Sequence, residues 1–414
     1  MTTPIHIRPA IDEDDRRRLR EFIGATQGAR GLLILDIHLA RARYRTDFTL
    51  LIERDGVLIG SALLRHIRLR LGGALIEAAE IEHLIIHQAH EQMVLHELVD
   101  VMLQICLEQG LVLLLLHAQA EPYLSMGFAP YSTHSLLSFE PLLPQTSAVH
   151  HRVEFALRPL NERLDKPADL GSLYELSQAG LALSEERKRT DWRGWPGIGM
   201  QALVFEDRHE ASVGYVVMES ISNQGMLVSE AALANIVYAE ALLRLLREFV
   251  YARSLPRLIL NLPHKHALIR AGRQLGGQVL EAHVALAMAE RPLALCGMVD
   301  VSAFLEQLMP ELERRLHLST YAGWRGTLMV RLDGDGATLH IEASHVHIEE
   351  IAAQATCELD ALSLGALTQL LLGIRAAADL HAAGELRYAE RYAGLIAVLF
   401  PYQGLETSQN TTDQ

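Results

Sequence analysis

The stretch IEHLIIHQAHEQMVLHELVDVML, residues 81–103, decides the fold of this 414-residue chain. Its first residues are apolar and β-branched, which predicts a buried strand. From about residue 91 the apolar residues recur at helical spacing, which predicts an amphipathic helix to about residue 109. Four histidines and no glycine lie across the strand-to-helix junction. The junction is therefore open to three interpretations: a metal site, an anion site at the helix N-terminus, or structure alone.

The four histidines do not form a metal-binding motif. His90 and Glu91 begin like the metalloprotease motif HExxH, but the next histidine is His96. Six residues advance a helix by about 600°, which leaves the two rings on different faces. His83 and His87 face one side of a regular strand but are about 13 Å apart along it. We therefore predict no metal at this junction.

Composition and charge narrow the class of protein. The net charge of −14 argues against a nucleic-acid partner, because phosphate binding needs a basic surface, and it favours a cationic small molecule. The three cysteines, Cys106, Cys296 and Cys357, are far apart and predict buried thiols rather than a disulfide framework. The start MTTPIHIRPAIDEDD lacks the pattern of a signal peptide, and LVLLLLH is too short to span a bilayer. We therefore expect a cytoplasmic protein without a membrane partner.

The order of the predicted elements indicates several domains. The chain is longer than the roughly 250 to 300 residues at which one hydrophobic core stops growing. Its first segment reads as a strand, a helix and an antiparallel meander with turns at Asp55-Gly56 and Gly72-Gly73. Residues 81–109 and a further apolar strand, LVLLLLHA, follow. This order predicts an α/β domain over residues 1–148.

Two more segments follow the first. MQALVFEDRHEASVGYVVMESISNQGMLVSEAALA reads as a second meander, AEALLRLLREFVYARS as a helix and RLILNLP as a strand, which predicts a diverged second copy over residues 152–290. Residues 296–402 contain a hairpin with the turn DGDG and an apolar helix, LSLGALTQLLLGIRAAADLHAAG. Residues 403–414 form a polar tail.

The junction in residues 81–103 also has the features of an anion site, because the first N–H groups of a helix are unpaired and its dipole is positive there. At this point the chain resembles the GNAT acyltransferases, whose loop Gln/Arg-x-x-Gly-x-Gly/Ala holds the pyrophosphate of acetyl-CoA. Aligned on that pattern, Glu91 takes the Gln/Arg position, and Val94 and His96 take the two glycine positions. A side chain at a glycine position prevents close approach of phosphate, and Glu91 repels it. We therefore expect acetyl-CoA binding to be weak or lost.

A second motif supports the same resemblance. AEPYLSMGFAPYSTHSLLSFE is similar to the GNAT segment xxYxxxGF, with Tyr123, Gly127 and Phe128 at the defining positions. The whole chain resembles the Eis-like acetyltransferases, and LCGMVDVSAFL is similar to the start of their third domain. The resemblance implies an α/β fold with mixed sheets: two tandem GNAT-like domains followed by an α/β domain of sterol-carrier-protein fold.

The resemblance also implies roles for individual residues. Tyr123 would be the general acid that returns a proton to the coenzyme A thiolate; the alternative is a half-buried structural tyrosine. The carboxylate of Gln414, the last residue, would accept the amine proton. Glu80 and Glu82, on one face of the strand before the loop, are alternative bases or else solvated charges. The residues expected to hold the coenzyme are Leu84, Ile85, Ile86, Gln92, Met93, Val94, Leu95, His96, Glu97, Ala118 and Gln119.

These observations lead to two functional expectations. The first is an acyl-CoA-dependent N-acyltransferase that transfers an acetyl group to a primary amine of a polyamine-like or aminoglycoside-like cation. The second is a non-catalytic binding protein that keeps the GNAT scaffold but has lost acetyl-CoA binding. Binding of acetyl-CoA separates the two. The resemblance further implies a homo-oligomer.

Overall fold

The computed structural model describes residues 4–40, 45–118, 120–131, 134–143, 154–161, 165–178, 183–187, 199–221, 225–279, 293–333, 335–349 and 354–403. The chain forms two compact units. The first comprises Met1–Tyr131, Ala182–Glu186 and Arg291–Leu405, and the second comprises Ser132–Leu181, Arg187–Glu290 and Glu406–Gln414. Their sheets contain both parallel and antiparallel strand pairs, which confirms the predicted mixed α/β class. In the described parts of the chain, no helix combines the length and the apolar character needed to cross a membrane.

The first unit is built on a mixed sheet with the strand order β1-β2-β3-β4-β5-β15-β6 and with β9 paired to β3. Neighbouring strands are antiparallel except β4 and β5, which are parallel. The predicted turn at Asp55-Gly56, where both residues have positive φ, joins β2 to β3. The strands are β1 (Ile5–Pro9), β2 (Thr49–Arg54), β3 (Val57–Leu71), β4 (Ala74–Ile86), β5 (Leu113–Ala118), β6 (Ala129–Pro130), β9 (Leu183–Glu185) and β15 (Leu293–Met298).

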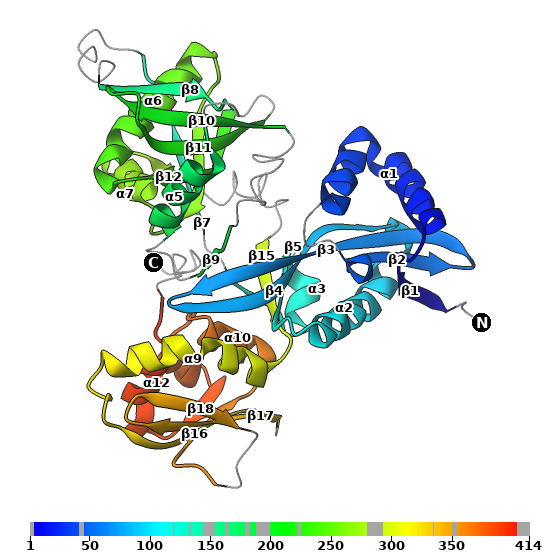
Figure 1. Ribbon diagram of the computed structural model, residues 1–414, viewed down its shortest axis with the longest axis vertical. Helices are drawn as coiled ribbons and strands as arrows, with labels where there is room; N and C mark the ends of the chain where they lie inside the picture. The colour runs from blue at the N-terminus through cyan, green and yellow to red at the C-terminus, as the bar shows by residue number, and fades with distance from the viewer. Residues whose placement is uncertain are drawn as a thin grey trace, which may run out of the picture. The chain divides into compact units, whose positions relative to one another are not determined.

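Helices α1 (Glu13–Leu39) and α2 (Glu91–Glu108) lie on opposite faces of this sheet (Figure 1). Helix α1 starts at Asp12, whose side chain accepts the N–H of Asp15, and kinks at Gly28. Its buried residues pack on one face of β2, β3 and β4. Helix α2 and the short helix α3 (Ala120–Leu124) pack on the other face, where the 3-10 turn η2 (Gln88–His90) links β4 to α2. Both helices therefore border the carboxyl end of β4.

The last segment of the first unit follows β15 with α9 (Val301–His317) and a second sheet of order β18-β17-β16-β19-β20. Glu311 of α9 accepts the N–H of Gly73 at 2.8 Å, and Gln307 accepts the N–H of Glu77 at 2.7 Å. A Cβ on Gly72 would lie 2.3 Å from the Glu311 carboxyl group, so only glycine fits this turn. The other elements are β16 (Arg325–Leu332), β17 (Asp335–Glu342), β18 (His345–Glu349), β19 (Cys357–Ala361), α10 (Leu364–Leu371), α11 (Ala377–Ala382), β20 (Leu386–Tyr388) and α12 (Ala393–Leu399).

The second unit is built on a sheet of order β8-β10-β11-β12-β13-β7-β14, which matches the seven-strand path of the first sheet position by position. The one parallel pair, β12 and β13, takes the place of β4 and β5. The elements are β7 (His134–Phe139), β8 (Phe155–Pro159), α5 (Pro167–Gln178), β10 (Met200–Asp207), β11 (Ser212–Ile221), β12 (Gly225–Leu233), α6 (Ala239–Ala252), β13 (Leu258–Pro263), α7 (Ala267–Gln274) and β14 (Gln278–Val279).

The position of β7 differs from the sequence expectation. STHSLLSFE falls within residues 1–148, the predicted first domain, but β7 pairs with β13 and β14 in the second sheet. The matching place in the first sheet, between β5 and β6, is taken by β15. The chain thus leaves the first sheet between Tyr131 and His134, ahead of the boundary predicted at residue 148. The second sheet thus receives β7 from the predicted first domain, and the first sheet includes two strands, β9 and β15, from beyond residue 148.

An arrangement of ion pairs also recurs in the two units. Arg8 of β1 donates to both carboxylate oxygens of Asp15, at 2.6 and 2.7 Å, and to Glu53 at 3.0 Å. Asp15 also accepts the N–H of Ile11 at 3.0 Å. The corresponding residues of the second unit are Arg158, Asp165, Glu206 and Asn161. This repetition, together with the matching strand orders, supports the predicted duplication.

Candidate active site

Strands β4 and β5 separate at their carboxyl ends. Their pairing stops at Glu80 and Leu115, although β4 continues to Ile86 and β5 to Ala118. Beyond that pair, β4 stays bonded to β3 and β5 to β15 on their outer sides. Within the described residues, the two facing edges have no strand partner, so their backbone N–H and C=O groups are available to a ligand. The opening between these strand ends is named the first fork.

A β-bulge in β4 changes the direction of the side chains at the first fork. The pairing with β3 passes from Ile81 directly to His83 across consecutive residues of β3, so Glu82 is the extra residue. A bulge bends its strand and can turn neighbouring side chains to one face. Glu82 and His83 both reach α1, since their side chains contact His38 and Gln27 of that helix.

Glu82 and His38 form a carboxylate–imidazole pair. His38, in the last turn of α1, is 2% exposed, and its Nδ1 lies 3.2 Å from Glu82 Oε2. The other ring nitrogen, Nε2, lies 3.2 Å from Thr49 Oγ1 of β2. Such a pair can take up a proton, because the imidazole can be protonated and the carboxylate stabilises it. Sequence reasoning missed His38, since nothing in the sequence indicates that the end of α1 meets the bulge.

Two buried polar atoms on this face of the sheet have no hydrogen-bond partner in the described part of the chain. His83 Nε2 donates to Gln27 Oε1 at 2.6 Å, so Nδ1 carries the lone pair, and this buried atom has no donor. Burial lowers the pKa of His83 and favours the neutral ring. Ser61 Oγ, on the adjacent strand β3, is the second such atom. Buried polar atoms of this kind are rare in folded proteins and call for an explanation.

Glu80, the other carboxylate predicted as a base, belongs to an ion-pair network. It accepts from Arg65 Nε at 3.0 Å, and Arg65 also donates to Glu185 of β9 at 2.7 Å. His117 Nδ1 lies 3.8 Å from Glu80. Because its carboxylate already accepts from a guanidinium, Glu80 anchors Arg65. Glu82 is therefore the better candidate for proton acceptance.

Tyr123 lies in α3, directly after β5. Its side chain is 4% exposed and packs edge-on against Phe128, with ring centroids 5.7 Å apart. Burial, with a smaller contribution from the charge of Glu91, raises the pKa of Tyr123 to about 12. The phenol is therefore protonated at neutral pH, as a proton donor must be. The structure gives its hydroxyl group no hydrogen bond to the described residues.

Several backbone N–H groups in the turn between β4 and α2 donate hydrogen bonds within the chain. His87 N–H donates to Ile59 O at 2.8 Å, and Ala89 N–H to the His87 ring at 3.4 Å. His90 N–H donates to His87 O at 2.8 Å, and Glu91 N–H also donates within the turn. An open phosphate cradle would instead direct several of these donors at the ligand.

The residues aligned with the glycines of the coenzyme loop lie inside a helix. Helix α2 begins at Glu91, and Val94 is 0% exposed among the apolar residues that cover the sheet. Leu95 is also buried, whereas His96 lies on the exposed side of the helix. The loop in this structure is residues 87–90, which precede the aligned positions.

The other residues predicted to hold the coenzyme are spread around the first fork. Ile85 packs under α1, whereas the half-buried Leu84 and Ile86 pack on the α2 side. Ala118 ends β5. Met93 and Glu97 are exposed on α2, and Gln92 lies in its first turn. Gln119 and Gln414 lie outside the described residues.

The described residues around the first fork include no cluster of metal ligands. Within the described ranges, no group of three or more His, Cys, Asp and Glu residues could hold a metal ion. The rings of His87 and His90 are 5.9 Å apart, and His90 Nδ1 lies 3.4 Å from Arg54. The three cysteines are free and buried, and burial raises the pKa of Cys106 to about 12.

The chain matches no family model and no curated protein, but it matches solved structures. A GCN5-related N-acetyltransferase from Anabaena variabilis ATCC 29413 is 12% identical, with 96% of this chain and 97% of that chain covered and a TM-score of 0.67. A conserved protein of unknown function from Enterococcus faecalis V583, described as a probable N-acyltransferase, is also 12% identical, with 97% of each chain covered and a TM-score of 0.67. Eis1 from Mycobacterium abscessus is 17% identical, with 97% of this chain and 96% of that chain covered and a TM-score of 0.58.

At these identities the likeness establishes the fold, and the function has to be inferred from the site. The coverage of 96% or more means that the likeness is not confined to the segment with the xxYxxxGF motif. Over nearly its whole length, the chain has the fold of the GCN5-related N-acetyltransferase structures.

Proposed function

We propose that the protein is an acyl-CoA-dependent N-acyltransferase and that its reaction takes place at the first fork. The observation that carries this proposal is the separation of β4 and β5, with Glu82 on the bulge of one strand and Tyr123 directly after the other. Unpaired strand edges bind extended, amide-containing chains by main-chain hydrogen bonds. The pantetheine arm of coenzyme A is such a chain.

The reaction needs two proton transfers: the amine loses a proton on the β4 side of the first fork, and the sulfur gains one on the β5 side. The amine nitrogen attacks the thioester carbon, the new C–N bond forms, and the C–S bond breaks as the tetrahedral intermediate collapses. The amine proton passes to the Glu82–His38 pair, in which Glu82 Oε2 and His38 Nδ1 are 3.2 Å apart. The hydroxyl group of Tyr123 donates a hydrogen bond to the leaving sulfur, which then takes up a proton on that side of the first fork. The products are an amide and the free thiol of coenzyme A.

The proposed acceptor is a primary amine of a cationic small molecule, polyamine-like or aminoglycoside-like. The net charge of −14 supports it, because a negative protein field attracts cations and raises their rate of encounter. Glu82 supports it locally, since a carboxylate beside the attacking nitrogen both orients the ammonium group and can take its proton.

The remaining expectations are also proposals. Two tandem GNAT-like domains agree with the matched strand orders and the repeated ion pairs of Arg8 and Arg158. A sterol-carrier-protein fold is proposed for the segment from α9 to α12, and a homo-oligomer and a cytoplasmic location are proposed from the resemblance and the sequence alone.

The second candidate is a non-catalytic binding protein that keeps the scaffold but has lost coenzyme binding. The observation that favours it is the turn at residues 87–90, where the N–H groups of His87, Ala89 and His90 are bonded within the chain, followed by the carboxylate of Glu91. A carboxylate in the first turn of a helix occupies the positive end of the dipole itself. Under this alternative the chain would show no response to acetyl-CoA.

The experiment that separates the two candidates measures free thiol. Purified full-length protein is mixed with acetyl-CoA and either spermidine or kanamycin, and release of coenzyme A is followed with a thiol reagent. The proposal predicts release that requires both the protein and the amine. A parallel thermal-shift titration with acetyl-CoA should raise the melting temperature, because a ligand that binds only the folded state stabilises it. A flat titration at millimolar acetyl-CoA, with no thiol release, would favour the second candidate.

A further inference from the structure

The second unit contains a cavity at its own fork. Strands β12 and β13 pair only as far as Val228 and Leu260, although β12 continues to Leu233 and β13 to Pro263. A cavity of about 690 Å³ opens at these ends, between the carboxyl end of β12, the N-terminus of α7 and the last turn of α5. Ligand cavities typically have volumes of roughly 300 to 1,000 Å³, so this one suits a molecule of nucleotide size.

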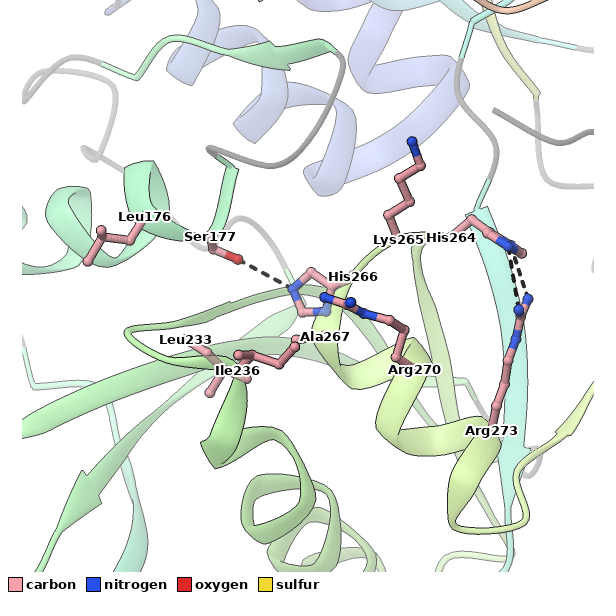
Figure 2. Close-up of a pocket in the computed structure, with 10 residues that line it drawn as sticks. All are labelled: Leu176, Ser177, Leu233, Ile236, His264, Lys265, His266, Ala267, Arg270 and Arg273. Atoms are coloured by element: carbon pink, nitrogen blue, oxygen red, sulfur yellow. Dashed lines mark hydrogen bonds between the residues drawn. The ribbon is translucent and has the colours of Figure 1, made fainter. Parts of the chain in front are cut away.

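The charged residues that line this cavity in the described part of the chain are all basic. Lys265, Arg270 and Arg273 line it, and none of its described lining residues is acidic, in a chain whose net charge is −14. Arg270 extends from α7 toward His266, whereas Lys265 extends away from it (Figure 2). The guanidinium of Arg270 makes no ion pair or hydrogen bond with the part of the chain that the structure describes. Among the described residues, no negative charge therefore compensates this guanidinium at the cavity.

Arg273 is held at the cavity by His264 and Ser135, neither of which carries a negative charge. Its guanidinium donates to His264 Nδ1 at 3.0 Å, as Figure 2 shows, and reaches Ser135 Oγ of β7 at 3.5 Å. Ser135 Oγ lies 2.9 Å from the same ring nitrogen. These contacts fix the position of the guanidinium without adding a negative charge. A second positive charge is thus available to a ligand.

The Ser177–His266 contact in the cavity is not a nucleophile–base pair. His266 Nδ1 accepts the N–H of Leu268 at 3.2 Å, so the ring proton is on Nε2, which lies 3.1 Å from Ala231 O and donates to it. Ser177 Oγ is 3.4 Å from that same protonated nitrogen, which has no lone pair and so cannot accept the proton of the serine hydroxyl group. The cavity is therefore arranged for binding rather than for nucleophilic catalysis.

We propose that this cavity is a binding site for a phosphate-bearing small molecule of nucleotide size. Guanidinium groups bind phosphate oxygens through paired, charge-assisted hydrogen bonds, which suits Arg270 and Arg273. Leu176, Leu233 and Ile236 supply an apolar wall for the rest of the ligand. All the residues belong to the second unit, so this site is separate from the first fork and its residues.

The test uses the full-length protein and isothermal titration calorimetry with three probes: inorganic pyrophosphate, adenosine 3′,5′-bisphosphate and adenosine. Arg270→Ala removes the uncompensated charge. Arg208→Ala is the matched control, because Arg208 is another exposed arginine of the second unit and lies in the β10–β11 turn, outside the cavity. Circular dichroism checks that each variant is folded, and Arg270→Gln replaces Arg270→Ala if the alanine variant is not.

Both phosphate-bearing probes should bind, and Arg270→Ala should weaken them at least about tenfold, as expected for a lost charge-assisted bond. Arg208→Ala should bind like the unaltered protein, and added salt should weaken binding. Three results would overturn the proposal: no binding of either phosphate probe at millimolar concentration, equal binding by Arg270→Ala, or adenosine binding as tightly as its bisphosphate.

Discussion

Replacing Tyr123 by Phe removes one hydroxyl group and leaves the packing of the ring unchanged. The ring is 4% exposed and stays edge-on against Phe128, so Tyr123→Phe should fold with the melting temperature of the unaltered protein. Any loss of activity can then be assigned to the hydroxyl group. Tyr388→Phe is the matched control, since Tyr388 packs against His381 in the sheet that follows α9 and belongs to none of the elements that form the first fork.

The pKa of Tyr123 determines the size of the expected effect. An ordinary thiol loses its proton near pH 8.5, so complete transfer from a phenol whose pKa is about 12 to the thiolate is uphill by about 3.5 pKa units, or about 5 kcal/mol. In the transition state the hydroxyl group therefore acts mainly as a hydrogen-bond donor to a developing charge. Such a bond is worth about 1.5 to 3 kcal/mol, so Tyr123→Phe should slow acyl transfer by about 10- to 150-fold.

The assay is the amine-dependent release of coenzyme A thiol, with kcat measured at saturating acetyl-CoA and amine. The rate should also show no alkaline decline caused by Tyr123 below about pH 11, because the protonated phenol is the active form and its pKa is about 12. Unchanged kcat in Tyr123→Phe would refute the proposed role of the hydroxyl group. So would an equal loss in Tyr388→Phe, since that loss would be unrelated to the first fork.

Three further substitutions test other parts of the structure. Glu82→Gln should slow transfer by about 100-fold or more without unfolding the chain, whereas Glu77→Gln, which changes the pair of Glu77 and His66 on the same strand, should not slow it. Equal rates in both variants would exclude Glu82 as the proton acceptor. Arg8 holds the pKa of Asp15 at about 2, below its ordinary value of 3.8. The pair of Arg8 and Asp15 therefore contributes about 2 kcal/mol to the free energy of unfolding above pH 4, and this contribution is lost as the pH falls through 2. Urea unfolding of Asp15→Asn at pH 7 should show the same loss, and an unchanged free energy of unfolding would contradict it. Val94→Gly should lower the free energy of unfolding by about 3 kcal/mol in the same assay, because it removes a buried side chain and places glycine inside a helix. The substitution should not restore coenzyme binding.

The sequence predicts the local elements better than their assembly. Apolar alternation and the turn at Asp55-Gly56 place the meander of the first sheet, because both depend on neighbouring residues. The sheet that each strand joins depends on distant residues. His134–Phe139 lies within the predicted first domain but joins the second sheet, and Leu293–Met298 lies next to the predicted start of the third segment but joins the first sheet. Nothing in their side-chain pattern distinguishes the two sheets.

The candidate site shows the same limit. Tyr123 is recognisable from the Gly127-Phe128 turn that follows it, because the motif is local. The pairing of Glu82 with His38 depends on a bulge and on the end of α1, and neither has a sequence signature. The early start of α2 places Val94 in the core, whereas an alignment to the glycine motif places it in a loop.

Amine-dependent release of coenzyme A from acetyl-CoA tests most directly whether the first fork is an acyltransferase site. The unaltered full-length protein should release thiol only when acetyl-CoA and an amine are both present, and Tyr123→Phe should release it about 10- to 150-fold more slowly. Arg270→Ala should release thiol at the rate of the unaltered protein, because Arg270 lines the cavity of the second unit. No release above the protein-free rate with any amine, together with no rise in melting temperature at millimolar acetyl-CoA, would contradict an acyltransferase.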